Sequence, residues 1–256
     1  MDTEAVLAAY DEQIRRQPTP DGFIERGERV VRAISPSGGW HGVTFSDLDD
    51  ANADSVIAAQ VARFAGYDQP WEWKYHSYDR PADLPDRLRG AGFDQGPDEA
   101  LLVAEIADLD LDVPPPDGVQ LREVVDREGL DALVSVHNEA FGGDHTDLGE
   151  AVWAAMRRQP SPVVAVVAIA DDRPVSGGRV EFSAGTDFAS IWGGGTVPAW
   201  RGRGVFRSLV AYRGRLAAAR GFRYLQVDAS PDSRPILKRL GFVELATTIP
   251  FTYPGP

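Results

Sequence analysis

The sequence predicts an α+β fold, in which helices flank a mixed central sheet and the two halves of the chain repeat one order of elements. Strand patterns alternate with helical patterns, and turn signals join several strands as hairpins. The proline run Pro114–Pro116 divides the chain near its middle, because three prolines continue neither a helix nor a central strand. We therefore expect a domain at 1–113, a linker at 114–118 and a second domain at 119–256.

Residues 119–256 contain ten predicted elements in the order βααβββαβαβ. Alternating or unbroken apolar residues predict the strands, and apolar residues three and four apart predict the helices. The turn Asp171–Pro174 favours a hairpin between two of the strands. The expected strands are 119–124, 163–170, 175–182, 188–197, 224–229 and 242–248, and the expected helices are 126–141, 148–159, 201–220 and 233–240.

The first half repeats the end of that order. We expect strands at 42–45, 71–78 and 100–106 and helices at 52–64 and 82–89. Residues 83–93 and 233–242 are similar, since each forms a helix with basic residues near its end and then continues through Gly-Phe towards a strand. This similarity indicates an internal duplication, or the common way in which helices end before strands. The aromatic strand 71–78 is interpreted as packing against the other domain or as walling an acceptor pocket.

The charge of the chain is unevenly distributed. Its 256 residues carry a net charge of −13, and the acid excess lies entirely in residues 1–116, whereas residues 201–239 carry ten basic side chains against two acidic ones. An acidic protein is a poor partner for nucleic acid, but a local basic segment suits a small polyanion or forms a solvated helix face. The absence of cysteine excludes disulfides and thiolate metal sites. Without a long apolar run or a secretion signal, we expect a cytoplasmic protein with no membrane partner.

A turn rich in glycine and arginine, Val197–Phe206, leads from a predicted strand into a predicted helix. A helix N-terminus exposes unpaired backbone N–H groups and the positive end of the helix dipole, so it attracts phosphate. Gly202 and Gly204 let a phosphate approach the backbone. The basic side chains that can pair with phosphate oxygens are Arg201, Arg203 and Arg207. The turn matches neither a dinucleotide-binding loop nor a P-loop, and a purely structural turn is the alternative.

This turn resembles the signature Arg/Gln-x-x-Gly-x-Gly/Ala of the GNAT superfamily of N-acetyltransferases. Arg201–Val205 matches all but the last position of the signature, Pro198 precedes it as expected, and Leu237–Phe242 resembles the family's second signature. The resemblance covers residues 119–256 and implies a GNAT fold that binds acetyl-CoA between two separated strands. It implies that backbone groups of Thr196 and Val197 hold the pantetheine arm and the thioester carbonyl, while N–H groups from Arg201 to Phe206 surround the pyrophosphate. By the same resemblance the cofactor-binding residues are Thr196, Val197, Arg201, Gly202, Arg203, Gly204, Val205, Phe206 and Ser230.

Three positions depart from the family pattern. Phe206 stands where the signature ends in Gly or Ala, so its ring must point away from the phosphates or into the core between helix and sheet. Leu237 stands where many members carry a tyrosine general acid, and Ser230 replaces the usual asparagine. In the first half, the equivalent turn reads Asp49–Asp54 and would repel phosphate. Cofactor binding is therefore expected only in the second half, without the family's usual proton relay.

Glu181 is the predicted catalytic base. It lies near the end of the strand 175–182 and shares a face with Arg179 by the period of two, a face that would line an acceptor cleft. The alternative is a solvent-facing strand residue. Glu139, Asp144 and His145 are further acceptor-side candidates. The run Gly193–Gly195 predicts a bulge, or backbone exposed towards the cofactor or acceptor.

The resulting hypothesis is an N-acetyltransferase that moves an acetyl group from acetyl-CoA, its co-substrate, to an amine of a small-molecule acceptor by direct attack in a ternary complex. A GNAT-fold module that binds CoA or another ligand without turnover is the alternative, as is transfer to a protein amine. The four histidines show no metal-ligand spacing, so we expect no metal. Monomer and homodimer both stay open.

Overall fold

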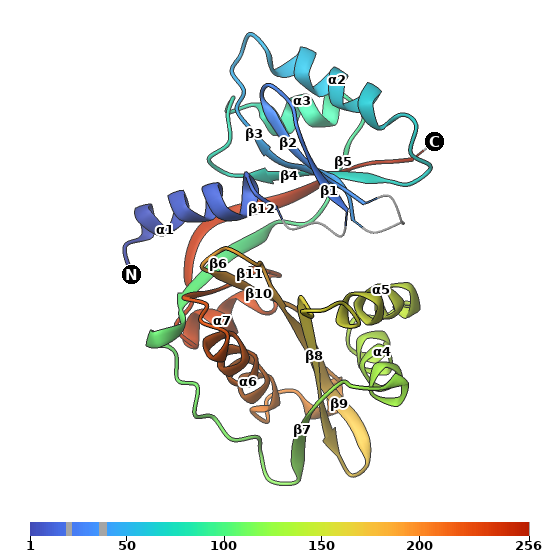
Figure 1. The fold of residues 1–256 in the computed structure, drawn as a ribbon, viewed down its shortest axis with the longest axis vertical. Coiled ribbons are helices and arrows are strands. Elements are labelled where there is room, and N and C mark those ends of the chain that lie inside the picture. The colour runs from blue at the N-terminus through green and yellow to red at the C-terminus, as the bar shows by residue number, and fades with distance from the viewer. Residues whose placement is uncertain (19–21, 36–39, 256) are drawn as a thin grey trace. The chain divides into compact units, whose positions relative to one another are not determined.

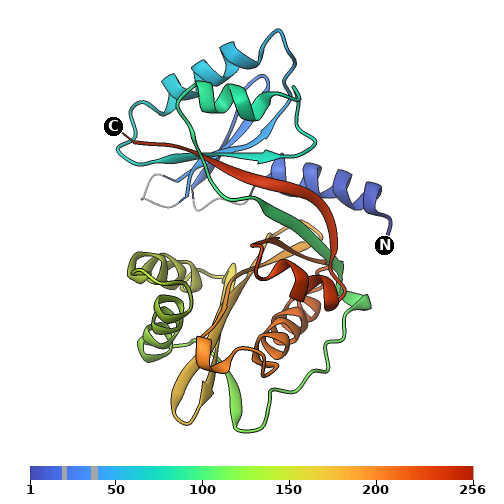
Figure 2. The same ribbon diagram turned by 180° about the vertical axis from the view of Figure 1, so that it is seen from behind.

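The computed structural model describes residues 1–18, 22–35 and 40–255. Helices and strands alternate along the chain (Figures 1 and 2), which confirms the α+β class with a mixed sheet flanked by helices. The chain forms two compact units. Unit 1 comprises Met1–Leu102, Asp228–Lys238 and Val243–Pro256, and unit 2 comprises Val103–Val227 and Arg239–Phe242. The predicted linker 114–118 lies inside unit 2, and the domain boundaries expected from the proline run stay a prediction.

Unit 2 contains the elements between the proline run and Val227. Strands β7, β8, β9 and β10 form an antiparallel series in that order, and β10 then pairs with β11 in parallel. The bounds are β7 Val119–Glu123, α4 Arg127–Phe141, α5 Thr146–Met156, β8 Val163–Ala170, β9 Arg173–Phe182, β10 Phe188–Thr196, the 3₁₀ turn η3 Pro198–Trp200, α6 Val205–Ala219 and β11 Tyr224–Ala229. Strand β6 (Glu99–Glu105) and β11 contribute residues to both units, and the 3₁₀ turn η2 (Ile106–Asp108) follows β6.

Helices cover both faces of the strands in unit 2. On one face, α4 packs on β9 so closely that a Cβ on Gly177 would lie 2.8 Å from Cδ1 of Leu133. In Figure 1 helix α6 lies on the other face of these strands. It packs equally closely, since a Cβ on Gly178 would lie 2.8 Å from Nη1 of Arg213. Successive strand residues point to opposite faces, so the two adjacent glycines admit one helix each.

The predicted helix 201–220 begins four residues later than expected. Residues 201–204 form a turn, and α6 starts at Val205 with Gly204 as its N-cap. The prediction was wrong at this end because Gly202 and Gly204 take positive φ angles of 73° and 87°, which a right-handed helix does not contain.

Unit 1 contains the elements that come before the proline run together with the end of the chain. Strands β1, β2 and β3 are antiparallel neighbours, β3 pairs with β4 in parallel, and β12 pairs with β4 over six antiparallel residue pairs. The bounds are α1 Thr3–Tyr10, the π-helical turn η1 Asp11–Arg15, β1 Phe23–Arg26, β2 Val30–Ile34, β3 Gly42–Ser46, α2 Ala53–Phe64, β4 Trp71–His76, α3 Leu84–Gly90, β5 Asp94–Gln95, α7 Arg234–Arg239 and β12 Val243–Tyr253. The last strand thus extends five residues beyond the predicted 242–248, because its second half completes the sheet of unit 1 beside β4.

The aromatic side chains of β4 belong to the core of unit 1. Trp71, Trp73 and Tyr75 are buried in one cluster with Phe64 of α2 and Leu88 of α3, and Trp73 is fully inaccessible. The prediction that this strand uses its aromatic residues against the other half, or as an acceptor wall, was therefore wrong. The alternation of β4 turns these rings towards α2 and α3, where their large apolar surfaces contribute most to stability.

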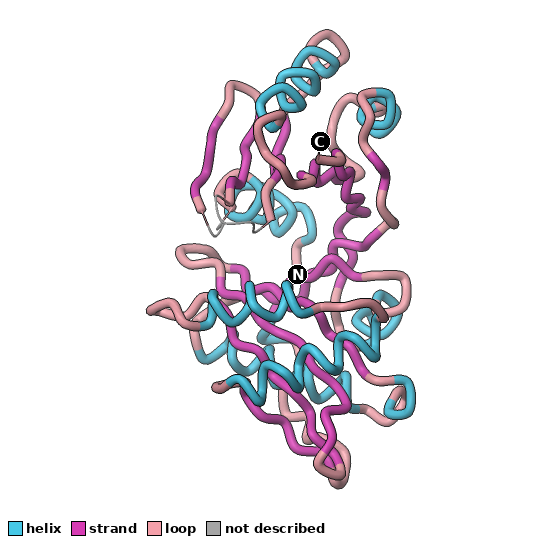
Figure 3. Tube along the Cα trace, turned by 90° about the vertical axis from the view of Figure 1, so that its right-hand side faces the viewer, coloured by secondary structure: helices cyan, strands magenta, loops and turns pink. Residues whose placement is uncertain are grey.

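The two units share one order of connections. Figure 3 distinguishes the helices from the strands of both units by colour. In unit 1 three antiparallel strands, β1 to β3, lead through α2 into the parallel strand β4. In unit 2 the strands β8 to β10 lead through α6 into the parallel strand β11. A helix is the usual connection between parallel neighbours. This common order agrees with the predicted repeat, and it makes the β3–α2 turn the counterpart of the β10–α6 turn.

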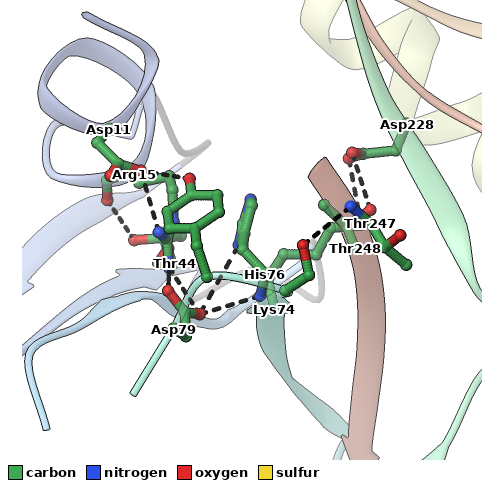
Figure 4. A network of polar contacts seen from close by, with 11 residues as sticks. Asp11, Arg15, Thr44, Lys74, His76, Asp79, Asp228, Thr247 and Thr248 are labelled. Carbon is green, nitrogen blue, oxygen red and sulfur yellow. Dashed lines mark hydrogen bonds and ion pairs between the residues drawn. The ribbon is translucent and has the colours of Figure 1, made fainter. Parts of the chain in front are cut away.

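A buried polar network stabilises unit 1 (Figure 4). Nη2 of Arg15 donates to both carboxylate oxygens of Asp79, at 2.8 and 2.9 Å, and the two side chains are 2% and 3% exposed. Burial opposes the charge on Arg15, but Asp79 and its other neighbours hold the pKa of the guanidinium above its ordinary value. On the same sheet Lys74 pairs with Glu99 at 3.0 Å and with Asp228 at 3.2 Å. These pairs link segments far apart in sequence.

Removal of Asp79 tests how much this network contributes to the stability of the fold. We expect Asp79→Ala to lower the free energy of unfolding by about 3–5 kcal/mol, because the buried guanidinium of Arg15 loses its buried carboxylate partner and keeps only the more exposed pair with Asp11. The control is Glu150→Ala, which breaks the exposed pair with Arg127 and should cost under about 1 kcal/mol. Urea unfolding followed by tryptophan fluorescence measures both values. Equal losses in the two variants would contradict the assigned role of the buried pair.

Candidate functional site

The turn between β10 and α6 leaves the first amides of the helix open. Gly204 is the N-cap of α6, and no side chain caps the helix there. The first intrahelical bond in this turn runs from the N–H of Ser208 to the carbonyl of Gly204, at 3.2 Å. The N–H groups of residues 205–207 therefore have no acceptor within the helix and point out of its N-terminus. A Cβ on Gly202 would meet nothing within 4 Å, so the approach to this backbone is open.

The corresponding turn of unit 1 is closed by its own carboxylate. Asp49 accepts hydrogen bonds from the N–H groups of Ala51 and Asn52, at 2.9 and 3.0 Å, just before α2 begins. An acidic side chain thus occupies the turn itself, while the N-cap Asn52 makes no side-chain hydrogen bond to the first turn of α2. The two turns therefore differ in charge, since the unit 1 turn carries carboxylates where the β10–α6 turn carries arginines and glycines.

The three arginines of the turn differ in their contacts. Arg201 donates from Nε to the carbonyl of Thr196 and from Nη2 to that of Ala140, each at 3.1 Å, so its side chain fastens the turn to β10 and α4. The guanidinium of Arg203 lies 4.7 Å from the ring centroid of Trp200. Arg207 pairs with Asp110 at 2.8 Å, and both side chains are more than half exposed. Arg203 and Arg207 remain at the surface near the open amides. Arg201 instead stabilises the conformation of the turn through its two hydrogen bonds.

The strands beside this turn separate. The parallel register of β10 and β11 joins only Phe188 to Tyr224, Ala189 to Leu225 and Ser190 to Gln226, although both strands continue further. Val197 donates to the carbonyl of Val175 on β9, at 3.0 Å. By the alternation of a strand, the backbone of Thr196 faces away from β9 and towards the side on which β11 has separated. An extended ligand can form hydrogen bonds with this edge of β10.

The apolar residues of the turn fix its position. Val197 and Val205 are buried in one cluster with Val175, and Trp200 packs against it. The ring of Phe206 lies against the strand, where a Cβ on Gly194 would be 2.9 Å from its Cε2. Phe206 thus points towards the sheet, as its bulk requires, and its backbone N–H remains at the N-terminus of α6. Val205 and Phe206 can contact a ligand at this turn through their N–H groups.

The run Gly193–Gly195 forms a bulge. The register of β10 with β9 shifts between Trp192 and Gly195, and Gly193 has a φ of 59°. Side chains press on the bulge from both helix layers: a Cβ on Gly193 would lie 3.0 Å from Cε1 of His137 on α4, and one on Gly194 would lie 2.9 Å from Cε2 of Phe206 on α6. The glycines are therefore explained by close packing as much as by exposure of the backbone.

Glu181 and Arg179 form an ion pair on the α4 face of β9. Nε of Arg179 donates to Oε1 of Glu181 at 2.6 Å, and the side chains are 15% and 42% exposed. The guanidinium of Arg179 also lies beside the bulge, since its Nη1 would be 3.2 Å from a Cβ on Gly193. The pair holds the Glu181 carboxylate in place while leaving it open to solvent and to a ligand.

The other predicted acceptor-side residues do not form one cluster. Glu139 is exposed on α4. Asp144 accepts two hydrogen bonds from Thr146, at 3.0 Å from the N–H and 2.6 Å from the hydroxyl, and so begins α5. His145 lies near the rings of His137 and Phe141, at centroid distances of 5.8 and 6.1 Å. Of these residues, His145 is the one placed close to the bulge region.

Ser230 and Leu237 lie in unit 1 at the short helix α7. The hydroxyl of Ser230 lies 3.2 Å from that of Ser233 and accepts from its N–H at 3.4 Å, so it participates in the turn that starts the helix. Leu237 is 1% exposed and contributes to the core. No titratable side chain therefore occupies the position of the family's tyrosine. The role of Ser230 in cofactor binding stays a prediction.

Two buried polar residues of this region were not among the site residues predicted from the sequence. Arg213 of α6 is 1% exposed and donates from Nη1 to the carbonyls of Arg179 and Trp192, at 3.2 and 3.4 Å. His137 of α4 is 3% exposed, and its Nε2 lies 2.9 Å from the carbonyl oxygen of Gly193. Burial, with nearby Arg179 and other positive charges, lowers the pKa of His137 to about 4, so its ring is neutral at pH 7. A signal was present, because each residue stands at an inward helical position among apolar neighbours.

Within residues 1–18, 22–35 and 40–255, no group of three histidine, aspartate or glutamate side chains is arranged to hold a metal ion. None of the helices in this described part is both long enough and apolar enough to span a lipid bilayer.

Solved structures with the same fold cover nearly the whole chain. A GCN5-related N-acetyltransferase from Kribbella flavida has a TM-score of 0.72 and 19% identity, with coverage of 100% of this chain and 96% of that one. A functionally unknown conserved protein from Staphylococcus epidermidis has a TM-score of 0.72 and 16% identity, covering 96% and 98% of the two chains. A GCN5-related N-acetyltransferase from Sphaerobacter thermophilus has a TM-score of 0.56 and 15% identity, covering 99% and 86%.

No protein-family model and no curated protein matches the sequence. At identities below 20% the structural likeness shows the fold alone. The chain has the fold of the GCN5-related N-acetyltransferases, the GNAT fold.

Proposed function

We propose that this protein is an N-acetyltransferase that transfers an acetyl group from acetyl-CoA to an amine of a small molecule by direct attack in a ternary complex. One observation carries the proposal: β10 separates from β11 and ends in a glycine-lined turn at the uncapped N-terminus of α6. A ligand that is extended at one end and carries phosphate at the other fits this arrangement. Acetyl-CoA has both properties, and two of the proteins that share the fold are described as N-acetyltransferases.

The residues of the turn divide the binding of the cofactor. Open N–H groups at residues 205–207, together with the helix dipole, bind the pyrophosphate, and Gly202 and Gly204 permit its close approach. Arg203 and Arg207 add positive charge at the surface. The backbone of Thr196 binds the pantetheine arm, while Val197 and Arg201 hold the strand end in place. Ser230 remains an additional predicted contact.

Glu181 acts as the base. Amine acetylation requires a neutral nitrogen, since a protonated amine has no lone pair with which to attack the thioester carbon. The Glu181 carboxylate, held by Arg179 and partly exposed, accepts the proton of the attacking amine directly or through one water. The new C–N bond then forms as the C–S bond breaks, and the sulfur leaves as a thiolate that takes up a proton from solvent. A thiol has an ordinary pKa near 8.5, about two units below that of an alkylamine such as lysine. Departure without a tyrosine acid is therefore consistent with Leu237.

The acceptor we propose is a cationic small molecule. The acid excess in residues 1–116 gives the protein a negative field that attracts protonated amines from solution. On the α4 face, Glu181 supplies a carboxylate for an ammonium group, and Phe141 at the end of α4 supplies, with His145, apolar ring surface.

A binding module without turnover is the second candidate. The buried Leu237 favours it, because the position of the general acid carries no ionisable group. Release of free thiol in the presence of a panel of amines separates the two functions. Acetyl-CoA binding without acceleration of thiol release by any amine, protein amines included, would favour the module.

Gly204→Glu tests the cofactor site. A carboxylate at the N-cap of α6 should repel the pyrophosphate and weaken acetyl-CoA binding at least about 10²-fold, as measured by calorimetry. The matched control is Gly221→Glu just beyond the opposite end of the same helix, where φ is 82° and a Cβ meets nothing within 4 Å. Both variants carry the same backbone strain and charge, so only position differs. Equal affinities in the two variants would refute the site.

Glu181→Gln tests the base. The amide preserves the shape and the contact with Arg179 but accepts no proton, so kcat should fall about 10²-fold while affinity for acetyl-CoA stays unchanged. The control is Glu150→Gln, which alters another carboxylate paired with an arginine, on α5. Steady-state kinetics with the best amine of the panel measures both. Wild-type kcat in Glu181→Gln would remove Glu181 from the mechanism.

A further inference from the structure

Two buried side chains meet the β10 bulge from opposite layers. The bulge interrupts the ladder between β9 and β10, so carbonyl and N–H groups near Gly193 and Gly194 lack regular strand partners. From the α6 layer, Nη1 of Arg213 donates to the carbonyls of Trp192 and Arg179, on the two strands at the point where the register breaks. From the α4 layer, the neutral ring of His137 donates through Nε2 to the carbonyl of Gly193, at 2.9 Å.

Arg213 is an unusual residue for this place. Its side chain is 1% exposed, no carboxylate pairs with it in the part of the chain that the structure describes, and its Nη2 is buried without a hydrogen-bond partner. Burial, together with the nearby Arg179, lowers its pKa from the ordinary value. Since removal of a guanidinium from water is costly, stability alone favours an apolar side chain at this inward position of α6. Its contacts with the bulge carbonyls suggest a different role.

The geometry of the peptide unit links these contacts to the opposite side of the bulge. In a trans peptide the C=O and N–H groups point in opposite directions within one plane. Arg213 holds the oxygen of Trp192 and thereby orients the N–H of Gly193. His137 holds the oxygen of Gly193 and thereby orients the N–H of Gly194. With glycine at both positions, the backbone would otherwise have wide conformational freedom.

We propose that Arg213 and His137 are positioning residues for acetyl transfer. They fix the carbonyl oxygens of Trp192 and Gly193, so that the N–H group of Gly193 or of Gly194 points at the thioester carbonyl. The proposal rests on the acetyl-CoA function above. A preoriented donor stabilises the negative charge that develops on this oxygen when the amine attacks, and it requires no reorganisation during the reaction. Neither side chain touches the reacting atoms, so each acts through the backbone.

Infrared spectroscopy of bound acetyl-CoA tests the proposal directly. The probe is acetyl-CoA labelled with ¹³C at the thioester carbonyl, whose stretching frequency falls when the oxygen accepts a hydrogen bond. We expect a lowered frequency in the wild-type complex and a return towards the free value in Arg213→Met and His137→Phe. In the same variants kcat should fall about 10²-fold, as for a small misplacement of a catalytic group, while affinity for acetyl-CoA changes little.

Conservative replacements distinguish positioning from a general effect on folding. His137→Gln retains an N–H donor for Gly193 and should recover much of the kcat and the frequency shift that His137→Phe loses. The control is Arg215→Met, two residues from Arg213 on the exposed side of α6, which should match wild type. If Arg213→Met fails to fold, the comparison of His137→Phe with His137→Gln tests the positioning role by itself.

The outcomes separate this proposal from the function on which it rests. If the wild type neither binds acetyl-CoA nor transfers its acetyl group, the proposed function fails. If the wild type binds and turns over, but folded Arg213→Met and His137→Phe keep its carbonyl frequency and kcat, the positioning role fails while the function stands. Equal losses in His137→Gln and His137→Phe would likewise overturn the role of His137.

Discussion

The separation of β10 from β11 is the constraint on which the candidate site depends. A strand that leaves its neighbour after three residue pairs exposes backbone donors and acceptors, which need partners elsewhere. In unit 2 the same strand is followed by a turn in which Gly202 and Gly204 have positive φ, and α6 then begins with open amides. The two features follow one another along a single stretch of backbone, so one extended ligand that bears phosphate can satisfy both.

Maintaining this separation requires groups that replace the missing strand contacts. Arg213 and His137 bind the carbonyls of the bulge from the two helix layers, Arg201 binds the carbonyl at the end of β10, and Val197 and Val205 anchor the turn in an apolar cluster. Unit 1 has the same order of connections, but Asp49 caps its turn and α2 follows at once. The two turns thus share a place in the order of connections but differ in charge and in glycine content.

Sequence patterns were informative where local physics determines structure. Unbroken or alternating apolar residues predicted the bounds of β8 and β11 to the residue. Helix α4 begins after its N-cap Asp126 and ends before Gly142, as the sequence predicted. Glycine spacing located the turn. The sequence did not predict the elements before residue 42: Arg15, buried beside Asp79 64 residues away, and Arg32, bonded to Gln60 of α2, derive their places from distant partners. For the same reason Arg213 and His137 were not identified, since the carbonyls they bind lie on strands that the helical pattern does not reveal.

Hydrogen exchange measures whether one ligand occupies both the edge of β10 and the N-terminus of α6. Deuterium uptake is measured by mass spectrometry with and without saturating acetyl-CoA. With acetyl-CoA bound, we expect slower exchange in peptides that cover 192–197 and in peptides that cover 202–208. The exchange rate at the β3–α2 turn of unit 1 should not change. Unchanged exchange at both segments of unit 2, or protection at the unit 1 turn instead, would contradict the binding of one ligand at both places.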